Sequence, residues 1–291
     1  MDTATVTVLR RDQWRPREAA HQRRADAATA GHRERAGRAA PHAIEDFLYD
    51  YYSVRPSRLR RWHPGVGVIL EEAPEHAAWR FYRAARDGVE VDLEAWFAER
   101  APAMDGIERI LAATASRPMF RGCFGLHEWA MVYRADDDRR HPLPLRLGAS
   151  GTDAVVEAHD LACTHIDAFR FFTPSAAPRN AVQLTRAGQL ESEQPGCLHA
   201  NMDLYKWAVK LTPLVPSELV MDAFELAMDI RYVDMQASPY DVSSFGLSAI
   251  AIETAEGKRE YAQRQADFGA RAQVIRGRLL DVIAAARALV G

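Results

Sequence analysis

The stretch EGKREYAQRQADFGARAQVIRGRLLDVIAAARAL, residues 256–289, carries the clearest folding pattern in this chain of 291 residues. Its apolar side chains recur mostly at intervals of three, four and seven residues, at Tyr261, Phe268, Ala272, Ile275, Leu279, Val282, Ala286 and Leu289. Side chains at these intervals lie on one face of an α-helix. The stretch therefore predicts a long helix that packs along this face against the rest of the fold.

Shorter segments before this stretch also show helical periodicity. We expect helices over residues 44–51, 76–86, 92–100, 103–115, 152–172, 198–211 and 217–235. Alternation of Thr and Val between Thr3 and Leu9, and the apolar run from Val66 to Leu70, predict short strands. The expected fold class is mainly α: a single helical domain over residues 41–291 with a few short β-strands.

Residues 1–40 differ from the rest in composition. From Arg11 to Ala40 the chain is rich in Arg and Ala and nearly lacks large apolar side chains. A helix here has little to bury, so we expect an N-terminal segment that is weakly ordered.

Charge is unevenly distributed along the chain. Residues 1–61 hold 13 Arg against 8 Asp or Glu, a balance of +5, which leaves −8 for the other residues of a chain with net charge −3. Phosphate contacts need such positive charge. The Arg-rich N-terminal region with Arg58, Arg60 and Arg61 is therefore either a DNA-contacting surface or a solvated tail.

Composition excludes several other classes of protein. Hydrophobic residues make up 48% and charged residues 26%, as in globular proteins. No apolar run approaches the roughly 18 residues of a bilayer span, so we expect no membrane partner. Cys123, Cys163 and Cys197 are odd in number and far apart, and no secretory signal precedes them. We therefore expect a cytoplasmic protein without disulfides; the oligomeric state has no signature in the sequence.

Polar residues in apolar context concentrate between Gly122 and Asp241. In the expected helix over 152–172, His159, Cys163, Asp167 and Arg170 fall near one face, with His165 on the neighbouring, more apolar face. Such residues lie either at the rim of a pocket or along a solvated stripe beside one core histidine.

The expected helix over 198–211 is entered through Glu193 and a Pro-Gly pair. His199 and Asp203 lie one turn apart, with Lys206 three residues further on. A histidine and a carboxylate at this spacing are typical of an acid–base couple or of two ligands to a metal ion. The alternative is an ordinary intrahelical pair between Asp203 and Lys206.

Two further segments carry acidic groups. His127 and Glu128 follow two glycines, but Met131 stands where a zinc-binding His-Glu-x-x-His motif has its second histidine. In the expected helix over 217–235, Glu218, Glu225 and others predict a solvated acidic face, from which Asp222 or Asp229 is a candidate to face the site. Dinucleotide, Walker, nucleophile-elbow and Cys-x-x-Cys motifs are absent from the sequence.

Residues 163–174, 193–206 and 230–241 resemble a family from high-GC Gram-positive bacteria that is commonly labelled 3-methyladenine DNA glycosylase. The resemblance covers about residue 41 to 291, and the Leu-Pro-Gly-x-Gly signature of the well-known alkylbase glycosylases is absent from the chain. It implies hydrolysis of the N-glycosidic bond of alkylated purines in DNA. That reaction needs a carboxylate, and aromatic surfaces that hold the extruded base.

The candidate residues follow from these observations. The expected catalytic residues are Asp203, His199, His165, Asp167 and Glu128. The expected substrate-binding residues are His127, Trp129, Arg170, Glu193, Tyr205, Lys206 and Tyr240. Two alternatives stay open: a hydrolase or oxygenase acting on a small molecule through acid–base groups or a divalent metal, and a helical binding module without catalysis. No cofactor other than that metal is expected.

Overall fold

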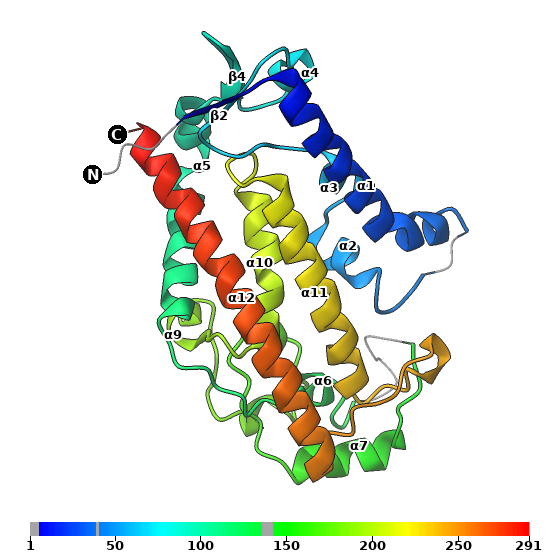
Figure 1. Ribbon diagram of the computed structural model, residues 1–291. Helices are drawn as coiled ribbons and strands as arrows, with labels where there is room; N and C mark the ends of the chain where they lie inside the picture. Colours follow the sequence, from blue (N-terminus) through cyan, green and yellow to red (C-terminus); the bar gives the residue numbers. More distant parts are fainter. Residues whose placement is uncertain (1–5, 39–40, 136–141, 291) are drawn as a thin grey trace. The chain divides into compact units, whose positions relative to one another are not determined.

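The computed structural model describes residues 6–38, 41–135 and 142–290, which form a mainly α fold with one small β-sheet (Figure 1). The predicted fold class is confirmed. The chain folds into two compact units, the first comprising Met1–Ala112, Leu204–Glu225 and Val274–Gly291, and the second comprising Ala113–Asp203 and Leu226–Gln273. Four helices, α5 (Leu93–Ala115), α10 (Leu198–Lys210), α11 (Ser217–Ala237) and α12 (Ala255–Val290), contribute residues to both.

The first unit contains a sheet with the strand order β1-β2-β4-β3. Its strands are β1 (Thr7–Leu9), β2 (Val68–Leu70), β3 (Tyr82–Ala85) and β4 (Gly88–Val91). Strand β1 is parallel to β2, with Thr7 opposite Val68, and the other neighbours are antiparallel. The helix expected over 76–86 is wrong: only α4 (Pro74–Ala77) is helical, because Tyr82–Ala85 pairs with β4 across a two-residue turn.

Three more helices complete the part of this unit that precedes α5: α1 (Arg11–Ala36), α2 (Phe47–Tyr52) and α3 (Pro56–Arg60). Helix α1, blue in Figure 1, lies against α3. Contrary to the expectation of little burial, α1 buries one stripe of side chains: Trp14, Glu18, His21, Ala25 and Thr29. Hydrophobic periodicity misses this stripe because three of its five members are polar.

The polar members of the α1 stripe have hydrogen-bond partners in the same unit. His21 Nε2 lies 2.8 Å from Leu59 O, and Thr29 Oγ1 donates to Ala25 O at 2.8 Å. A buried polar group with a partner avoids the cost of desolvation without compensation. Arginines beside the stripe form ion pairs: Arg24 contacts Asp222 and Glu225, Arg35 contacts Glu45 and Asp46, and Arg60 contacts Asp26. The N-terminal arginines thus bind carboxylates of their own chain.

The second unit consists of short helices, long connections and parts of the four shared helices. Its own helices are α6 (Leu126–Ala130), α7 (Gly148–Glu157), α8 (Ile166–Phe169), η1 (Ala177–Arg179), α9 (Gln189–Ser192) and η2 (Ser243–Phe245). Residues 136–141 lie outside the described residues. Among the described residues, no helix combines the length and apolar character that a bilayer crossing needs.

The single helix expected over 152–172 is wrong. Helix α7 ends at Glu157, and Leu161 forms a parallel β-bridge with Asn180. The Asn180 side chain accepts from the Cys163 backbone N–H at 2.8 Å and donates to the Cys163 carbonyl at 3.0 Å. These bonds replace helical ones, so the helical spacing of His159, Cys163 and Asp167 loses its meaning and His165 ends an extended segment.

Replacing Trp14 with alanine tests whether α1 is part of the core. Trp14 has no solvent exposure, its ring stacks on Trp62 at 6.2 Å between centroids, and its Nε1 donates to Glu71 O at 2.9 Å. We expect Trp14→Ala to lower the free energy of unfolding by about 3–5 kcal/mol, measured by urea denaturation. The control is Arg23→Ala on the exposed face of the same helix, with an expected change below about 0.5 kcal/mol. Equal effects of the two changes would contradict a core role for α1.

Stability of the fold is expected to depend on the protonation of His63. Burial, reinforced by His76 and Arg61 nearby, lowers the pKa of His63 to about 3. Between the unfolded value near 6.5 and this folded value, the unfolded chain holds more protons, so stability present above pH 6.5 is lost as the pH falls. Between pH 6.5 and pH 5, protonation of His63 in the unfolded chain lowers the free energy of unfolding by about 2 kcal/mol. His63→Gln is expected to flatten the pH dependence of the urea midpoint by that amount; an unchanged slope would refute it.

Candidate metal centre

A glycine positions the first pair of site residues in the second unit. Gly125 precedes α6 with φ 73°, and a Cβ there would approach Ala237 Cβ and Tyr261 Cε2 at 3.3 Å. The positive φ and the close neighbours both disfavour any residue with a side chain at this position. Helix α6 begins directly after this glycine, and its residues His127 and Glu128 are buried.

His127 and Glu128 meet two residues of α11 that lie more than 100 positions later. His127 Nε2 is 2.9 Å from Asp234 Oδ1. The guanidinium of Arg231 lies 3.2 Å from Asp234 Oδ2 and 3.4 Å from Glu128 Oε1. All four side chains are at most 5% exposed. Two carboxylates, one guanidinium and one imidazole thus form a network removed from water.

A second group forms around His165. Its Nε2 lies 3.3 Å from Glu193 Oε1 and 3.5 Å from Asp203 Oδ2. His165 immediately precedes α8, Glu193 follows α9, and Asp203 is on α10. These three side chains are at most 2% exposed. Three predicted site residues from three separate segments thus meet at His165.

His199 connects the two groups. Its ring centroid lies 4.5 Å from that of His127 and 5.4 Å from that of His165. Unlike the other members, His199 is only half-buried, so the cluster reaches the surface at this imidazole. We refer to these eight residues as the His/carboxylate cluster: His127, Glu128, His165, Glu193, His199, Asp203, Arg231 and Asp234.

The connection before α10 is held by close backbone packing. A Cβ on Gly196 would lie 2.3 Å from Phe120 O, so only glycine fits at this position. Gln194 Oε1 accepts from the backbone N–H groups of Phe120 and Gly196 at 2.9 and 2.7 Å. Gln189 Nε2 donates to Glu193 Oε1 at 2.6 Å. The Pro-Gly pair noted in the sequence thus lies in a tightly packed connection between Glu193 and His199.

The imidazoles of His127 and His199 have pKa values that are shifted in opposite directions. Burial alone would lower the pKa of His127, but the Asp234 carboxylate outweighs it and raises that pKa well above its usual value. Burial would raise the pKa of Asp234, yet His127 and Arg231 hold it well below its usual range. Burial and the charge on His127 lower the pKa of His199 well below its usual value. His199 is therefore neutral and keeps a lone pair.

Two of the three thiols, Cys163 and Cys197, are poor ligands by comparison. Burial raises the pKa of Cys197 to about 12 and raises that of Cys163 well above its usual value. Metal ions bind the thiolate form, which such burial disfavours. The donors of this cluster are thus imidazole nitrogens and carboxylate oxygens.

Two sets of three side chains have the geometry of metal ligands. In the set His127, His199 and Asp234, and again in the set His165, Glu193 and Asp203, one donor atom per residue lies within 4.8 Å of the others. For His127 with Asp234 and for His165 with Glu193 and Asp203 the donors are 2.9, 3.3 and 3.5 Å apart, which at a bond length of about 2.1 Å would subtend about 90 to 110° at a common ion. These angles fall between octahedral and tetrahedral coordination.

The structure brings six predicted residues together: His127, Glu128, His165, Glu193, His199 and Asp203. Asp167 forms ion pairs with Arg170 and Arg186 instead, because the break after α7 places it on a separate short helix.

The predicted aromatic and basic residues have other surroundings. Trp129 and Tyr240 have no solvent exposure, and Trp129 Nε1 donates to Ala237 O at 2.8 Å, so neither ring offers a face to a base. Tyr205 is fully buried and belongs, with Lys206, to the first unit.

Asp234 and Arg231 were not among the predicted site residues. A signal for Asp234 exists: with Ala227, Ile230 and Ala237 it forms a stripe of almost no exposure on α11. A carboxylate on such an apolar face needs a buried partner. The predicted candidates on this helix, Asp222 and Asp229, pair instead with arginines.

No protein-family model, no curated protein and no solved structure matches this chain. The assignment of the site therefore rests on its residues and their geometry.

Arg231 is expected to be essential for the metal-free cluster. Replacing Arg231 with methionine leaves Asp234 and Glu128 without its positive charge in a buried site, which costs about 3–5 kcal/mol of unfolding free energy. The matched control is Arg271→Met, which removes an exposed pair with Asp229 and costs less than about 1 kcal/mol. Urea denaturation after chelator treatment measures both. Comparable small losses would contradict the importance of the buried network.

Proposed function

We propose that this protein is a metal-dependent enzyme that acts on a small molecule at the His/carboxylate cluster. The observation that carries the proposal is the pair of three-residue ligand sets, built from separate segments of one compact unit and joined through adjacent imidazoles. A set of two imidazoles and one carboxylate is typical of catalytic zinc and of non-haem iron, and it leaves coordination positions for substrate or water.

Charge balance supports the binding of metal cations. The cluster contains four carboxylates, from Glu128, Glu193, Asp203 and Asp234, but a single guanidinium, from Arg231. Carboxylates buried together are stabilised by positive charge placed among them. Protonation of His127 supplies one charge in the absence of metal; a dication in its place would supply two and release the proton.

Each part of the cluster has a role under this proposal. His127, His199 and Asp234 would hold one ion, and His165, Glu193 and Asp203 would hold a second. Arg231, which also contacts Glu128, would orient Asp234 from outside the ligand set, as hydrogen-bonded partners commonly do for metal ligands. The half-buried His199 marks the side from which substrate approaches.

The identity of the metal separates two reaction types. Zinc has no redox chemistry and supports hydrolysis through bound water. Iron in a site of two histidines and one carboxylate supports reaction with oxygen. Both reactions suit a small substrate, because the ligands other than His199 are withdrawn from the surface.

Hydrolysis of alkylated bases in DNA, which the family resemblance implies, stays a prediction. The carboxylates it requires are present in Glu193 and Asp203. The stacking surfaces expected from Trp129 and Tyr240 are buried, and the arginines at positions 24, 35 and 60 pair with carboxylates. These contacts favour the small-molecule proposal.

Metal content after purification tests the proposal. The chain, depleted with chelator and then titrated with Zn²⁺, Mn²⁺ or Fe²⁺ under exclusion of oxygen, is expected to bind one or two equivalents with dissociation constants below about 1 μM. Asp203→Asn and His199→Gln are expected each to remove about one equivalent, measured by elemental analysis after gel filtration.

The control for this titration is His159→Gln in the same unit. His159 lies outside both ligand sets, and its Nδ1 bonds to Val155 O of the preceding turn. Its replacement should leave metal content unchanged. Failure of the unaltered protein to bind any of the three ions, or equal loss in all three variants, would refute the metal centre. Release of bases from alkylated duplex DNA by metal-free protein would favour the glycosylase instead.

A further inference from the structure

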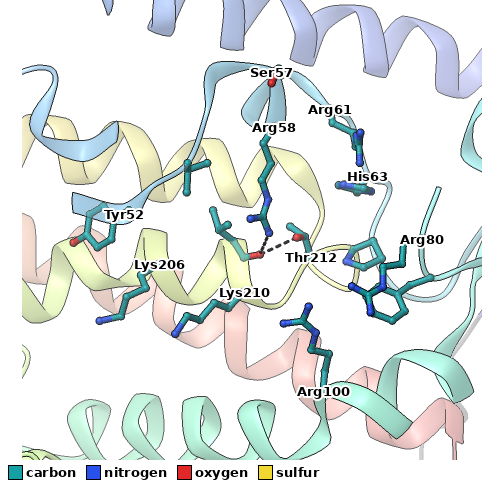
Figure 2. A pocket seen from close by; sticks show the side chains of 14 residues that line it. Tyr52, Ser57, Arg58, Arg61, His63, Arg80, Arg100, Lys206, Lys210 and Thr212 are labelled. Atoms are coloured by element: carbon teal, nitrogen blue, oxygen red, sulfur yellow. Dashed lines mark hydrogen bonds between the residues drawn. The ribbon is translucent and has the colours of Figure 1, made fainter. Parts of the chain in front are cut away.

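The first unit contains a cavity that is unrelated to the His/carboxylate cluster. It has a volume of about 620 Å³ and is lined by residues from α2, α3, α5, α10 and the connections beside them. This volume lies within the roughly 300–1,000 Å³ of pockets that bind small molecules. Figure 2 shows basic side chains entering the cavity from several of these elements.

The lining of this cavity is strongly basic. Six of its residues are cationic and, within the described part of the chain, none that lines it is acidic: Arg58, Arg61, Arg80, Arg100, Lys206 and Lys210. In Figure 2, Arg58 extends from α3 toward the space that Lys210 and Arg100 border from the opposite side. Cations gathered around one cavity repel each other, and a bound anion relieves that repulsion.

Several of these cations contact groups of their own unit. Glu99, which does not line the cavity, forms ion pairs with Arg80 and Arg100. Arg61 stacks on Trp79 with its guanidinium carbon 4.8 Å from the ring centroid. The Arg58 guanidinium donates to the Val209 carbonyl at 3.3 Å. Partial removal from water and the charges of Arg100 and Arg61 lower the pKa of Arg58, so its environment disfavours positive charge in the absence of a ligand.

The cavity also has a strained aromatic wall. Phe81 has φ 64°, a left-handed conformation that is strained for a bulky residue and that clusters at ligand and active sites. The Phe81 ring and Tyr52 line the cavity together with the cations. An aromatic surface beside guanidinium groups is suited to a ligand with a planar ring attached to an anionic chain.

We propose that this cavity binds a small multiply phosphorylated molecule of nucleotide size, with its phosphate chain between Arg58, Arg100 and Lys210. Guanidinium groups bind phosphate oxygens through paired hydrogen bonds, and several such groups favour a chain of phosphates over a single one. The shared chemistry is the di- or triphosphate, whether free or carried by a nucleoside. The site is independent of metal binding at the His/carboxylate cluster.

Isothermal titration calorimetry of the chelator-treated full chain with inorganic tripolyphosphate, ATP and AMP tests the proposal. Tripolyphosphate and ATP are expected to bind at one site and AMP at least about tenfold more weakly. Tighter binding of ATP than of tripolyphosphate supports a nucleotide ligand, and equal binding supports a free polyphosphate. Affinity is expected to fall as the salt concentration is raised.

Three variants locate the site. Arg58→Gln and Lys210→Gln are each expected to weaken tripolyphosphate binding by about tenfold while the unfolding midpoint stays unchanged. Arg23→Gln, which removes the same charge from the exposed face of α1, should bind like the unaltered chain. A fourth variant, Asp203→Asn, should also bind normally, which separates this cavity from the metal centre.

Three outcomes overturn the proposal. The first is absence of binding to any of the three phosphates by the unaltered chain. The second is equal weakening by Arg23→Gln and Arg58→Gln, which would indicate general attraction to positive charge. The third is tighter binding of a single-stranded oligonucleotide of about 12 nucleotides than of tripolyphosphate, because that result would assign the cations to a nucleic-acid surface.

Discussion

The hydrogen bond between His127 and Asp234 is the interaction on which the second unit depends. It joins a short helix that begins after a glycine to the buried face of α11, and it does so without access of water. Asp234 keeps its charge only because His127 and Arg231 supply opposite charge at about 3 Å. Burial and the charge that Asp234 stabilises on His127 in turn lower the pKa of the neighbouring His199, which is therefore neutral and has a lone pair free to donate.

The same constraint explains why the cluster contains so many ionisable groups in so little space. Each buried carboxylate requires a partner. Arg231 contacts Glu128 and Asp234, His127 contacts Asp234, and His165 lies beside Glu193 and Asp203. A site of this kind is costly for a fold that uses it only for stability, because apolar residues of similar volume are at least as stabilising as a buried ion pair. The metal binding that we propose would give the arrangement a chemical purpose.

In the first unit, buried polar residues bond to backbone carbonyls, and charged residues form ion pairs. Helix α1 buries a stripe in which His21 and Thr29 bond to backbone carbonyls, while its arginines pair with carboxylates. The cavity of Figure 2 has no carboxylate among the described residues that line it. The small net charge of the chain is thus an average over an acidic cluster in one unit and a basic cavity in the other.

Local sequence patterns are sufficient to predict α10, α11, α12 and the mainly α class. Periodicity of residues 256–289 and the Pro-Gly entry before Leu198 predict α12 and α10, because helix faces and helix starts depend on neighbours three to seven positions apart. His127, His165, His199 and Asp203 are recognisable in the sequence as ionisable groups in apolar context. Only the tertiary structure brings these groups together. It also places Asp234 rather than Asp167 beside His127, and it buries one face of α1. The contact of His127 with Asp234 spans 107 positions, and the bonds of Asn180 to Cys163 break a helix that local periodicity favours. No local pattern encodes such long-range partners, since the buried, low-dielectric surroundings that strengthen these contacts exist only once the chain has folded.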